Sequence, residues 1–304
     1  MEHIIDEIKR LKREKNAIIL VHYYQRPEVQ EVADFLGDSL GLSQEAAKTD
    51  ADIILFCGVH FMAETASIIS PEKKVLIPVL NAGCTLAESV TAAGIRTWRL
   101  KNPEGLVVSY VNTSAEVKAE SDYCVTSANA LDIVRRLPEG RPILFGPDRH
   151  LGGYIQKVTG RAMDIWQGAC YVHEEITAEL VRQFLDNYPD ADLLIHPESE
   201  ACLHSDILDH PRVKVGSTAF IMKEPARSGK QQYVIATELD TLAELQKRYP
   251  DSQFIPILPQ RDCEYMKLTT LEDVRDALLY ERYEVNVPAD IREKAIIPIQ
   301  RMME

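Results

Sequence analysis

The chain has 304 residues, of which 45% are hydrophobic, so it is long enough to bury a sizeable core. Its 47 acidic and 34 basic residues give a formal net charge of -13, which argues against a nucleic-acid surface, because phosphate binding needs clustered Lys and Arg. The longest apolar runs, at 18–21 and 53–56, are far shorter than the roughly 18 residues of a membrane span. Residues 2–15 are charged throughout and do not resemble an export signal, so we expect a cytoplasmic protein.

The first part of the chain predicts alternating helices and strands. A helix is expected over 4–15, because Ile4, Ile8 and Leu11 recur at helical spacing and mark one buried face. The segments that follow are IILVHYYQ (18–25), GDSL (37–40), ILFCGVHFM (54–62) and finally Cys84. Continuous apolar strands of this kind are typical of parallel sheets that are covered on both faces.

The same order of motifs appears twice more. A weaker helical pattern at 91–101 precedes LVVSYVNT (106–113), TSANAL (126–131), ILFGPDRHL (143–151) and Cys170. A third pattern at 176–189, with Leu180 and Phe184 on its apolar face, precedes LLIHPES (193–199), GSTAFI (216–221), VIATEL (234–239) and Cys263. A last helical segment, from about Thr270, starts a further helix-strand step that is not completed.

The spacings within the copies also match. His22 and Ser39 are 17 residues apart, as are Tyr110 and Ser127. A repeated unit places equivalent loops around a common axis. We therefore predict an α/β protein of three homologous three-layer α/β/α domains in pseudo-threefold arrangement, each with a short three-stranded parallel sheet, and an active site at the centre. The expected domains are 1–85, 86–171 and 172–267, with the tail 268–304 packing on the first.

Polar side chains follow the first strand of each copy, where parallel α/β units bind ligands. They are His22, Tyr23, Tyr24 and Gln25, then Tyr110, Asn112 and Thr113, then His196 and Glu198. Small hydroxyl-bearing residues also recur at predicted helix starts, namely Ser39, Ser127 and the pair Ser217 and Thr218. Helix N-termini bind carboxylate and phosphate through free N–H groups, so the threefold recurrence favours a multiply anionic small molecule, although a single such segment is more often only a helix cap.

Three of the six cysteines, Cys84, Cys170 and Cys263, lie at equivalent ends of the copies. Their convergence predicts a three-thiolate site for zinc or an iron-sulfur cluster, and an incomplete ligand set leaves one metal position open to substrate. Cys57 and Cys124 lie in apolar strand-like segments and are interpreted as buried small side chains.

Two further residues have both a functional and a structural interpretation. His173, three residues after Cys170, is a fourth ligand, an active-site donor, or a hydrogen-bonded loop histidine. Glu198 is either a general base that removes a carbon-bound proton beside a metal-bound substrate, or a solvated loop acid. The residues alone leave these alternatives open.

Motifs along nearly the whole chain resemble the quinolinate synthase family. Those that carry the resemblance include HYYQ (22–25), GVHFMAET (58–65), YVNTSAEVKAESD (110–122), WQGACYVH (166–173), HPES (196–199) and CEYMK (263–267). The resemblance implies condensation of iminoaspartate with dihydroxyacetone phosphate to quinolinate, phosphate and water in de novo NAD biosynthesis. It also implies a four-iron, four-sulfur cluster (4Fe-4S) on Cys84, Cys170 and Cys263 with one open iron, and iminoaspartate supplied by an aspartate oxidase or dehydrogenase.

The resemblance also implies roles for individual residues. Glu198, Tyr24, His196 and Tyr110 are implied as catalytic, with Tyr110 near the open iron. The implied substrate contacts are His22, Ser39, Tyr110, Asn112, Ser127, His173, His196, Glu198, Ser217 and Thr218. The chain departs from other members in reading CTLAES from Cys84 onward. It also carries Ser199 where some members have a cysteine and lacks a multi-cysteine insertion that some have before the third ligand, but neither of these two changes removes a cluster ligand.

Three rival interpretations are kept at this point. One is another iron-sulfur enzyme on the same scaffold, such as the diphthamide-synthesis type that cleaves S-adenosylmethionine. A second is a non-catalytic iron or oxygen sensor, which would show no turnover. The third is a structural zinc protein, which would contain zinc without iron or sulfide.

Overall fold

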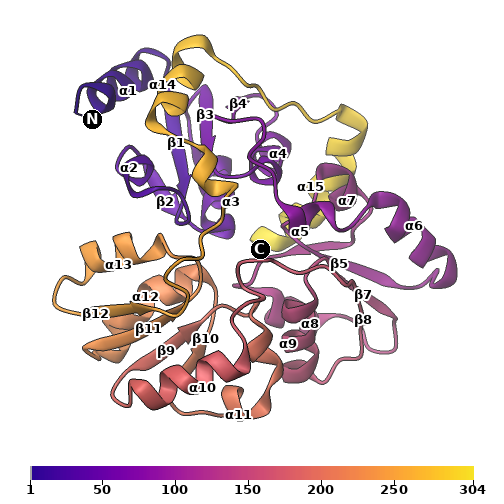
Figure 1. Ribbon diagram of the computed structural model, residues 1–304. Helices are drawn as coiled ribbons and strands as arrows, with labels where there is room; N and C mark the ends of the chain where they lie inside the picture. Colours follow the sequence, from indigo (N-terminus) through magenta and orange to yellow (C-terminus); the bar gives the residue numbers. More distant parts are fainter. Residues whose placement is uncertain (1) are drawn as a thin grey trace.

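The computed structural model describes residues 2–304, which form three α/β units around a common centre (Figure 1). The strands of the first unit are β1 (Ala17–His22), β2 (Phe35–Gly37), β3 (Ile53–Cys57) and β4 (Lys74–Leu76). All are parallel, in the order β2-β1-β3-β4. The helices of this unit are α1 (Glu2–Glu14), α2 (Pro27–Gln30), α3 (Ser39–Lys48), α4 (His60–Ile69) and α5 (Thr85–Glu88).

The second unit repeats this arrangement with the strands β5 (Leu106–Tyr110), β6 (Tyr123–Val125), β7 (Ile143–Gly146) and β8 (Asp164–Ile165). Its parallel order is β6-β5-β7-β8. Its helices are α6 (Ala92–Lys101), α7 (Ala115–Ala119), α8 (Ala130–Arg136) and α9 (Arg149–Thr159).

The third unit has the strands β9 (Asp192–Ile195), β10 (Val213–Val215), β11 (Gln232–Ala236) and β12 (Gln253–Pro256), in the parallel order β10-β9-β11-β12. Its helices are α10 (Ala178–Asn187), the short 3-10 helix η1 (Glu200–Leu203), α11 (Ser205–Leu208), α12 (Thr218–Ser228), α13 (Thr241–Arg248) and η2 (Met266–Leu268). The tail adds α14 (Leu271–Tyr280) and α15 (Ala289–Met303).

The predicted fold class is confirmed, but the prediction of three strands per sheet is wrong. Within residues 2–304 each sheet has four strands, and the fourth is always a short edge strand next to the third. In the second unit this strand is only two residues long, and its Asp164 is exposed. Apolar periodicity cannot detect so short an edge strand, because it has too few buried positions to form a pattern.

The first strand of every unit lies inside its sheet, between the second and third strands. The four side chains of Leu20–Val21 and Leu193–Leu194 are completely buried, as expected for strands covered by helices on both faces. The carboxyl ends of these inner strands point to the centre of the molecule in each unit (Figure 1). Their polar continuations are thereby brought together.

The three helices predicted before the repeats are present as α1, α6 and α10. Ile8 and Leu11 of α1 are buried as expected, whereas Leu180 and Phe184 of α10 are only half-buried. The buried face of α10 instead carries Ala178, Val181 and Leu185. The larger residues lie at the margin of this face, still in contact with the core.

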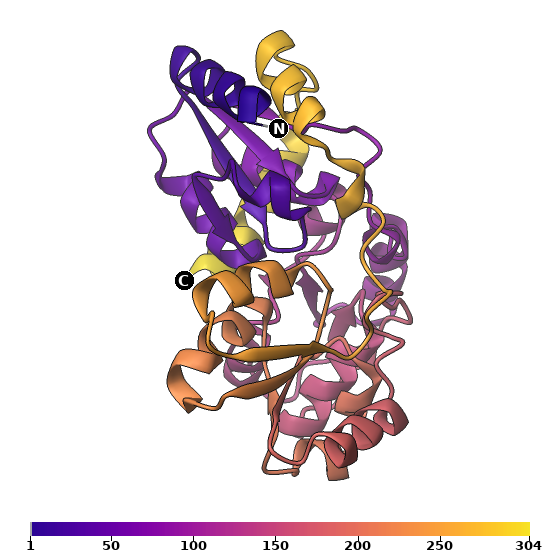
Figure 2. The same cartoon turned by 60° about the vertical axis from the view of Figure 1, so that its left-hand side comes forward.

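The tail packs in two places. Helix α14 lies beside α1, as Figures 1 and 2 both show, and contacts the first unit. Helix α15 contacts α7 and β6 of the second unit as well as α3 and α4 of the first, and Asn129 Nδ2 donates a hydrogen bond to the carbonyl of Met302 at 2.7 Å. The second half of the tail therefore also joins the two units, in addition to the expected contact with the first.

Removing the side chain of Ile299 is expected to weaken the packing of α15 against the first and second units. Ile299 of α15 is completely buried in a core that contains residues of both units, so Ile299→Ala should lower the free energy of unfolding by about 2–5 kcal/mol. Urea denaturation of the metal-free protein measures this. Ile297→Ala on the same helix, where Ile297 is 50% exposed, is the matched control. Equal effects of the two substitutions would contradict the shared core.

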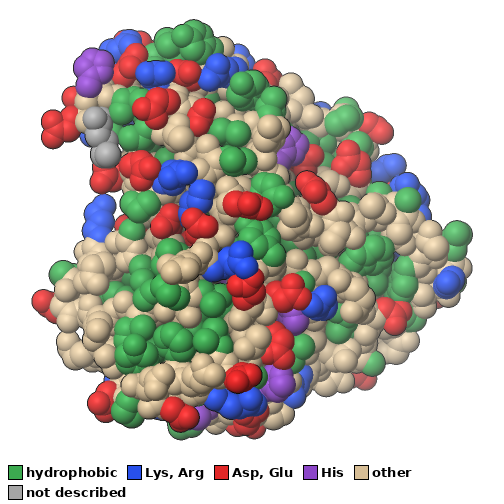
Figure 3. Space-filling view, viewed as in Figure 1, with side chains coloured by type: hydrophobic (Ala, Val, Ile, Leu, Met, Phe, Trp, Pro, Cys, Tyr) green, Lys and Arg blue, Asp and Glu red, His purple; other side chains and the backbone are tan. Residues whose placement is uncertain are grey.

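On the face drawn in Figure 3, Lys and Arg side chains are interspersed with Asp and Glu, and no broad basic patch appears there. Among the helices of residues 2–304, none combines the length and the apolar character that crossing a membrane requires.

Candidate active site

A cavity lies at the centre, where residues of all three units meet. Thirteen of the fourteen site residues predicted from the sequence line it, and they come from all three units: His22, Tyr24, Ser39, Cys84, Tyr110, Asn112, Ser127, Cys170, His173, His196, Glu198, Thr218 and Cys263. Ser217 does not line the cavity. Its side chain instead accepts a hydrogen bond from the amide of Phe220 and caps α12.

The strand ends and helix starts occupy equivalent places. His22 and Tyr110 end β1 and β5, and His196 follows β9. Ser39 and Thr218 are the first residues of α3 and α12, while Ser127 lies three residues before α8. Ser39 and Thr218 therefore line the cavity from helix starts, whereas Ser127 lines it from the loop before α8.

The three cysteines are free thiols that line the cavity together. Burial raises the pKa of Cys84 to about 12 and raises the pKa values of Cys170 and Cys263, with further contributions from the neighbouring thiols to Cys84 and Cys170. Thiols kept neutral by burial become ligands when a metal displaces their protons. Three converging thiols are a suitable donor set for an iron-sulfur cluster with one protein ligand missing.

Local contacts hold each thiol. Cys84 precedes α5, and Cys170 donates its amide proton to Oδ2 of the buried Asp148 at 3.2 Å. The loop before Cys170 needs glycine at 168, because a Cβ atom there would lie 2.7 Å from the carbonyl oxygen of Pro147. Cys263 donates its amide proton to Oε1 of Glu238 at 3.3 Å.

A hydrogen-bonded chain connects the first and third units across the cavity. The Tyr24 hydroxyl lies 2.8 Å from Thr218 Oγ1 and 2.9 Å from Thr237 Oγ1. His173 Nε2 is 2.9 Å from the same Thr237 hydroxyl. A proton can therefore pass between Tyr24 and His173 through one hydroxyl group.

His173 Nδ1 lies 3.0 Å from Glu198 Oε2 and 3.3 Å from Cys170 Sγ. The ligand atoms of Cys170, His173 and Glu198 lie within 4.8 Å of one another, close enough to hold a single metal ion. Both functional interpretations of His173 are compatible with this geometry. The Glu198 side chain beside His173 is also buried. Because Glu198 is only 3% exposed, its interpretation as a solvated loop acid is wrong.

Glu198 carries its charge in the folded protein. Burial by itself raises its pKa, but its proximity to His196 and its hydrogen bonds with His173 and Tyr110 outweigh this and lower the pKa below the usual value. Burial and Glu198 raise the pKa of Tyr110, and burial above all raises that of Tyr24. Glu198 is therefore an ionised carboxylate beside phenols that stay protonated and can donate hydrogen bonds.

Two histidines of the cavity are neutral. Burial is the main reason that the pKa values of His22 and His196 are lowered to about 3. The Nδ1 atom of His22 accepts a hydrogen bond from the Tyr24 amide at 3.2 Å, and that of His196 accepts one from the Glu198 amide at 3.4 Å. An Nδ1 atom that accepts is unprotonated, so each ring can still donate through Nε2.

Acidification is expected to destabilise the metal-free protein through these two histidines. The unfolded chain protonates them below about pH 6.5, whereas the folded protein does so only near pH 3, so the unfolded state binds more protons between these values. The free energy of unfolding should fall as the pH decreases, by up to about 2 kcal/mol per histidine between pH 6.5 and 5. Urea denaturation at both pH values measures this. His22→Gln should remove the contribution of His22 to this pH dependence of the free energy of unfolding. An unchanged pH dependence in that variant would count against the prediction.

Sequence reasoning missed several residues at the cavity. Glu238 is completely buried and lines it, and Thr237 belongs to the chain described above. Both directly follow β11, so the rule applied to the other strand ends could have found them. Asp148 lies two residues after β7, so the same rule also covers it, whereas Lys267 has no comparable signal, because its partner Glu238 lies far from it in the sequence.

The described residues 2–304 place no Lys or Arg side chain in the lining of the cavity. A bound anion would therefore meet hydroxyl groups, backbone amides, neutral imidazoles and any metal, and not a basic side chain. Asn112 lines the cavity with a buried Oδ1 atom that has no hydrogen-bond partner within residues 2–304. Such an orphaned acceptor indicates that a donor group of a ligand belongs beside it.

Comparisons with known proteins agree with this site. The family model described as Quinolinate synthetase A protein matches residues 6–304. The chain is 51% identical over 303 residues to a protein named quinolinate synthase from Pyrobaculum aerophilum, with 98% of each chain covered. It is 48% identical over 302 residues to a protein of that name from Thermus thermophilus, which covers 99% of this chain and 97% of the relative. The resemblance seen in the motifs is thereby confirmed, and the chain belongs to the quinolinate synthase family of enzymes.

Proposed function

We propose that this chain condenses iminoaspartate with dihydroxyacetone phosphate to form quinolinate, with release of phosphate and two water molecules, in de novo NAD biosynthesis. The observation that carries the proposal is the convergence of Cys84, Cys170 and Cys263 in a cavity lined by polar strand ends. These cysteines hold a 4Fe-4S cluster with one open iron. When bound, the cluster supplies a Lewis acid to the substrate.

The residues of the chain bind the two anionic substrates without a basic side chain. Ser39, Ser127 and Thr218 offer hydroxyl groups to carboxylate and phosphate oxygens, and Ser39 and Thr218 add the amides of two helix starts. His22 and His196, both neutral, add donors that do not depend on pH near neutrality. Asn112 orients the substrate through its unpaired amide oxygen. Ser217 acts only indirectly, by capping the helix that presents Thr218.

Glu198 acts as the general base for the carbon-bound protons. Its carboxylate is ionised, buried and in contact with His173, so it can accept a proton and share it with that imidazole. Tyr24 is connected to His173 by hydrogen bonds through the Thr237 hydroxyl, and it moves protons to leaving hydroxyl groups. Tyr110 donates a hydrogen bond to Glu198 and orients it.

The supply of substrate and the location are also proposals. Imines hydrolyse in water, so we place an aspartate oxidase or dehydrogenase before this enzyme as the source of iminoaspartate. We expect all of this chemistry in the cytoplasm.

The proximity of Cys170, His173 and Glu198 supports one alternative, a single metal ion such as zinc held by these three residues. Anaerobic purification followed by iron, sulfide and zinc analysis distinguishes the iron-sulfur cluster from a single metal ion. About four irons and four sulfides per chain, with quinolinate formed from both substrates, support the proposal. One zinc per chain without sulfide, or a complete cluster without quinolinate formation, would contradict it.

A further inference from the structure

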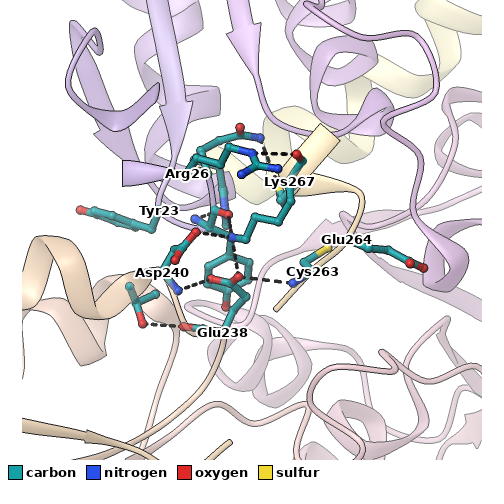
Figure 4. A network of polar contacts seen from close by, with 12 residues as sticks. Tyr23, Arg26, Glu238, Asp240, Cys263, Glu264 and Lys267 are labelled. Carbon is teal, nitrogen blue, oxygen red and sulfur yellow. Dashed lines mark hydrogen bonds and ion pairs between the residues drawn. The ribbon is translucent and has the colours of Figure 1, made fainter. Parts of the chain in front are cut away.

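The loop that carries the third cysteine is anchored by a buried lysine. In this segment, here called the Cys263 loop (257–270), the Lys267 side chain is only 10% exposed. Its Nζ atom donates to Glu238 Oε1 at 2.6 Å and to the carbonyl oxygen of Tyr24 at 2.5 Å, and it lies 2.7 Å from Asp240 Oδ2. An ammonium group has three protons, so Lys267 is fully satisfied. Figure 4 shows this side chain extending from the loop toward Asp240 and Glu238.

Glu238 transmits this anchoring to the metal site. The same Oε1 atom that accepts from Lys267 also accepts the amide proton of Cys263 at 3.3 Å, while Oε2 accepts the amide proton of Asp240 at 2.9 Å. The Lys267 amide in turn donates to the carbonyl oxygen of Cys263 at 3.1 Å. Glu238 and Lys267 thus hold the backbone of Cys263 at both its amide and its carbonyl group.

The network also crosses from the third unit to the first. Tyr24 and Arg26 follow β1, and Arg26 Nε donates to the Lys267 carbonyl at 2.8 Å. Gln30 Nε2 is 3.3 Å from the carbonyl oxygen of Asp240. Lys267 therefore lies where the first unit, the third unit and the Cys263 loop meet.

We propose that Lys267 is a positioning residue for the metal centre. By holding Glu238 against the Cys263 amide and by joining the first and third units, it fixes the third thiolate in place. The inference rests on the proposed function, because it concerns the cluster that the three cysteines hold. Lys267 also offsets the negative charge of Glu238, which lines the cavity, and so reduces the repulsion between Glu238 and an anionic substrate.

The test is Lys267→Met, which keeps the length of the side chain and removes its charge and its three hydrogen bonds. Holoenzyme purified without oxygen is mixed with an iron chelator, and the loss of cluster absorbance is followed. Iron release should become about tenfold faster or more, as expected when the support of a ligand is lost. Lys74→Met is the matched control, because Lys74 also lies 2.6 Å from a glutamate, Glu281, and neither residue lines the cavity. Its iron release should equal that of the wild type.

A second variant guards against misfolding. Lys267→Met leaves Glu238 buried without its counter-charge, which can destabilise the whole protein. The double variant Lys267→Met, Glu238→Gln removes that charge and should recover thermal stability, yet it should still release iron faster than the wild type. A wild-type rate in either variant would overturn the inference, as would equal acceleration in Lys74→Met.

The metal-free protein gives an independent readout. Amide hydrogen exchange in the Cys263 loop should be faster in Lys267→Met than in the wild type, with no change in the segment around Lys74. If the wild type binds no iron but the exchange differs, the proposed cluster fails while the anchoring by Lys267 holds. If the wild type binds its iron and neither exchange nor release differs, the inference alone is wrong.

Discussion

Replacing Cys170 with serine is expected to remove the iron and abolish quinolinate formation together. Cys170 lines the central cavity, and its amide and its sulfur are held by Asp148 and His173. A serine hydroxyl is a harder and much less acidic donor than a thiol and does not replace it in an iron-sulfur site. Iron and sulfide per chain, with the rate of quinolinate formation, should both fall to background after anaerobic purification.

The control for this prediction is Cys57→Ala. Cys57 is equally a free cysteine, but it lies buried in β3 and does not line the cavity. The variant should lose some stability and keep its iron and its activity. Full iron and sulfide in Cys170→Ser would mean that other residues hold the metal, and the ligand assignment would then be wrong.

Glu198→Gln is expected to lower kcat by about 10²–10⁴-fold while the iron content stays at the wild-type value. Glutamine has nearly the same shape and keeps a carbonyl oxygen for the hydrogen bond from Tyr110, but it can no longer accept a proton from carbon. Because the cysteines are untouched, iron analysis and thermal unfolding separate a chemical effect from a structural one. Steady-state kinetics with both substrates gives kcat and KM.

Glu200→Gln serves as the matched control for this substitution. Glu200 lies two residues further along, pairs with His204 at 2.6 Å and does not line the cavity. Its kcat should stay within about twofold of the wild type. Wild-type turnover in Glu198→Gln would rule out Glu198 as the base, whereas a loss of turnover in Glu200→Gln as well would point to a structural effect in this segment.

Much of the fold could be predicted because the sequence repeats itself. Three copies with the same order of motifs, two of them with the same 17-residue spacing from His22 to Ser39 and from Tyr110 to Ser127, indicated three equivalent α/β units, and the structure has them. The fourth strands could not be predicted, because strands as short as Asp164–Ile165 contain too few buried residues for a pattern. The packing of α15 between two units likewise has no local signal, since an apolar face does not specify its partner.

The candidate site divides in the same way. The sequence by itself determined which residues could do chemistry, because polar groups after buried strands and cysteines at equivalent positions are local features that a repeat places around one axis. Only the tertiary structure decided which of two adjacent hydroxyls, Ser217 or Thr218, faces the cavity, because one residue of helix rotation separates them. It alone also paired Lys267 with Glu238, since contacts between residues 29 positions apart depend on how the units pack and not on any local pattern.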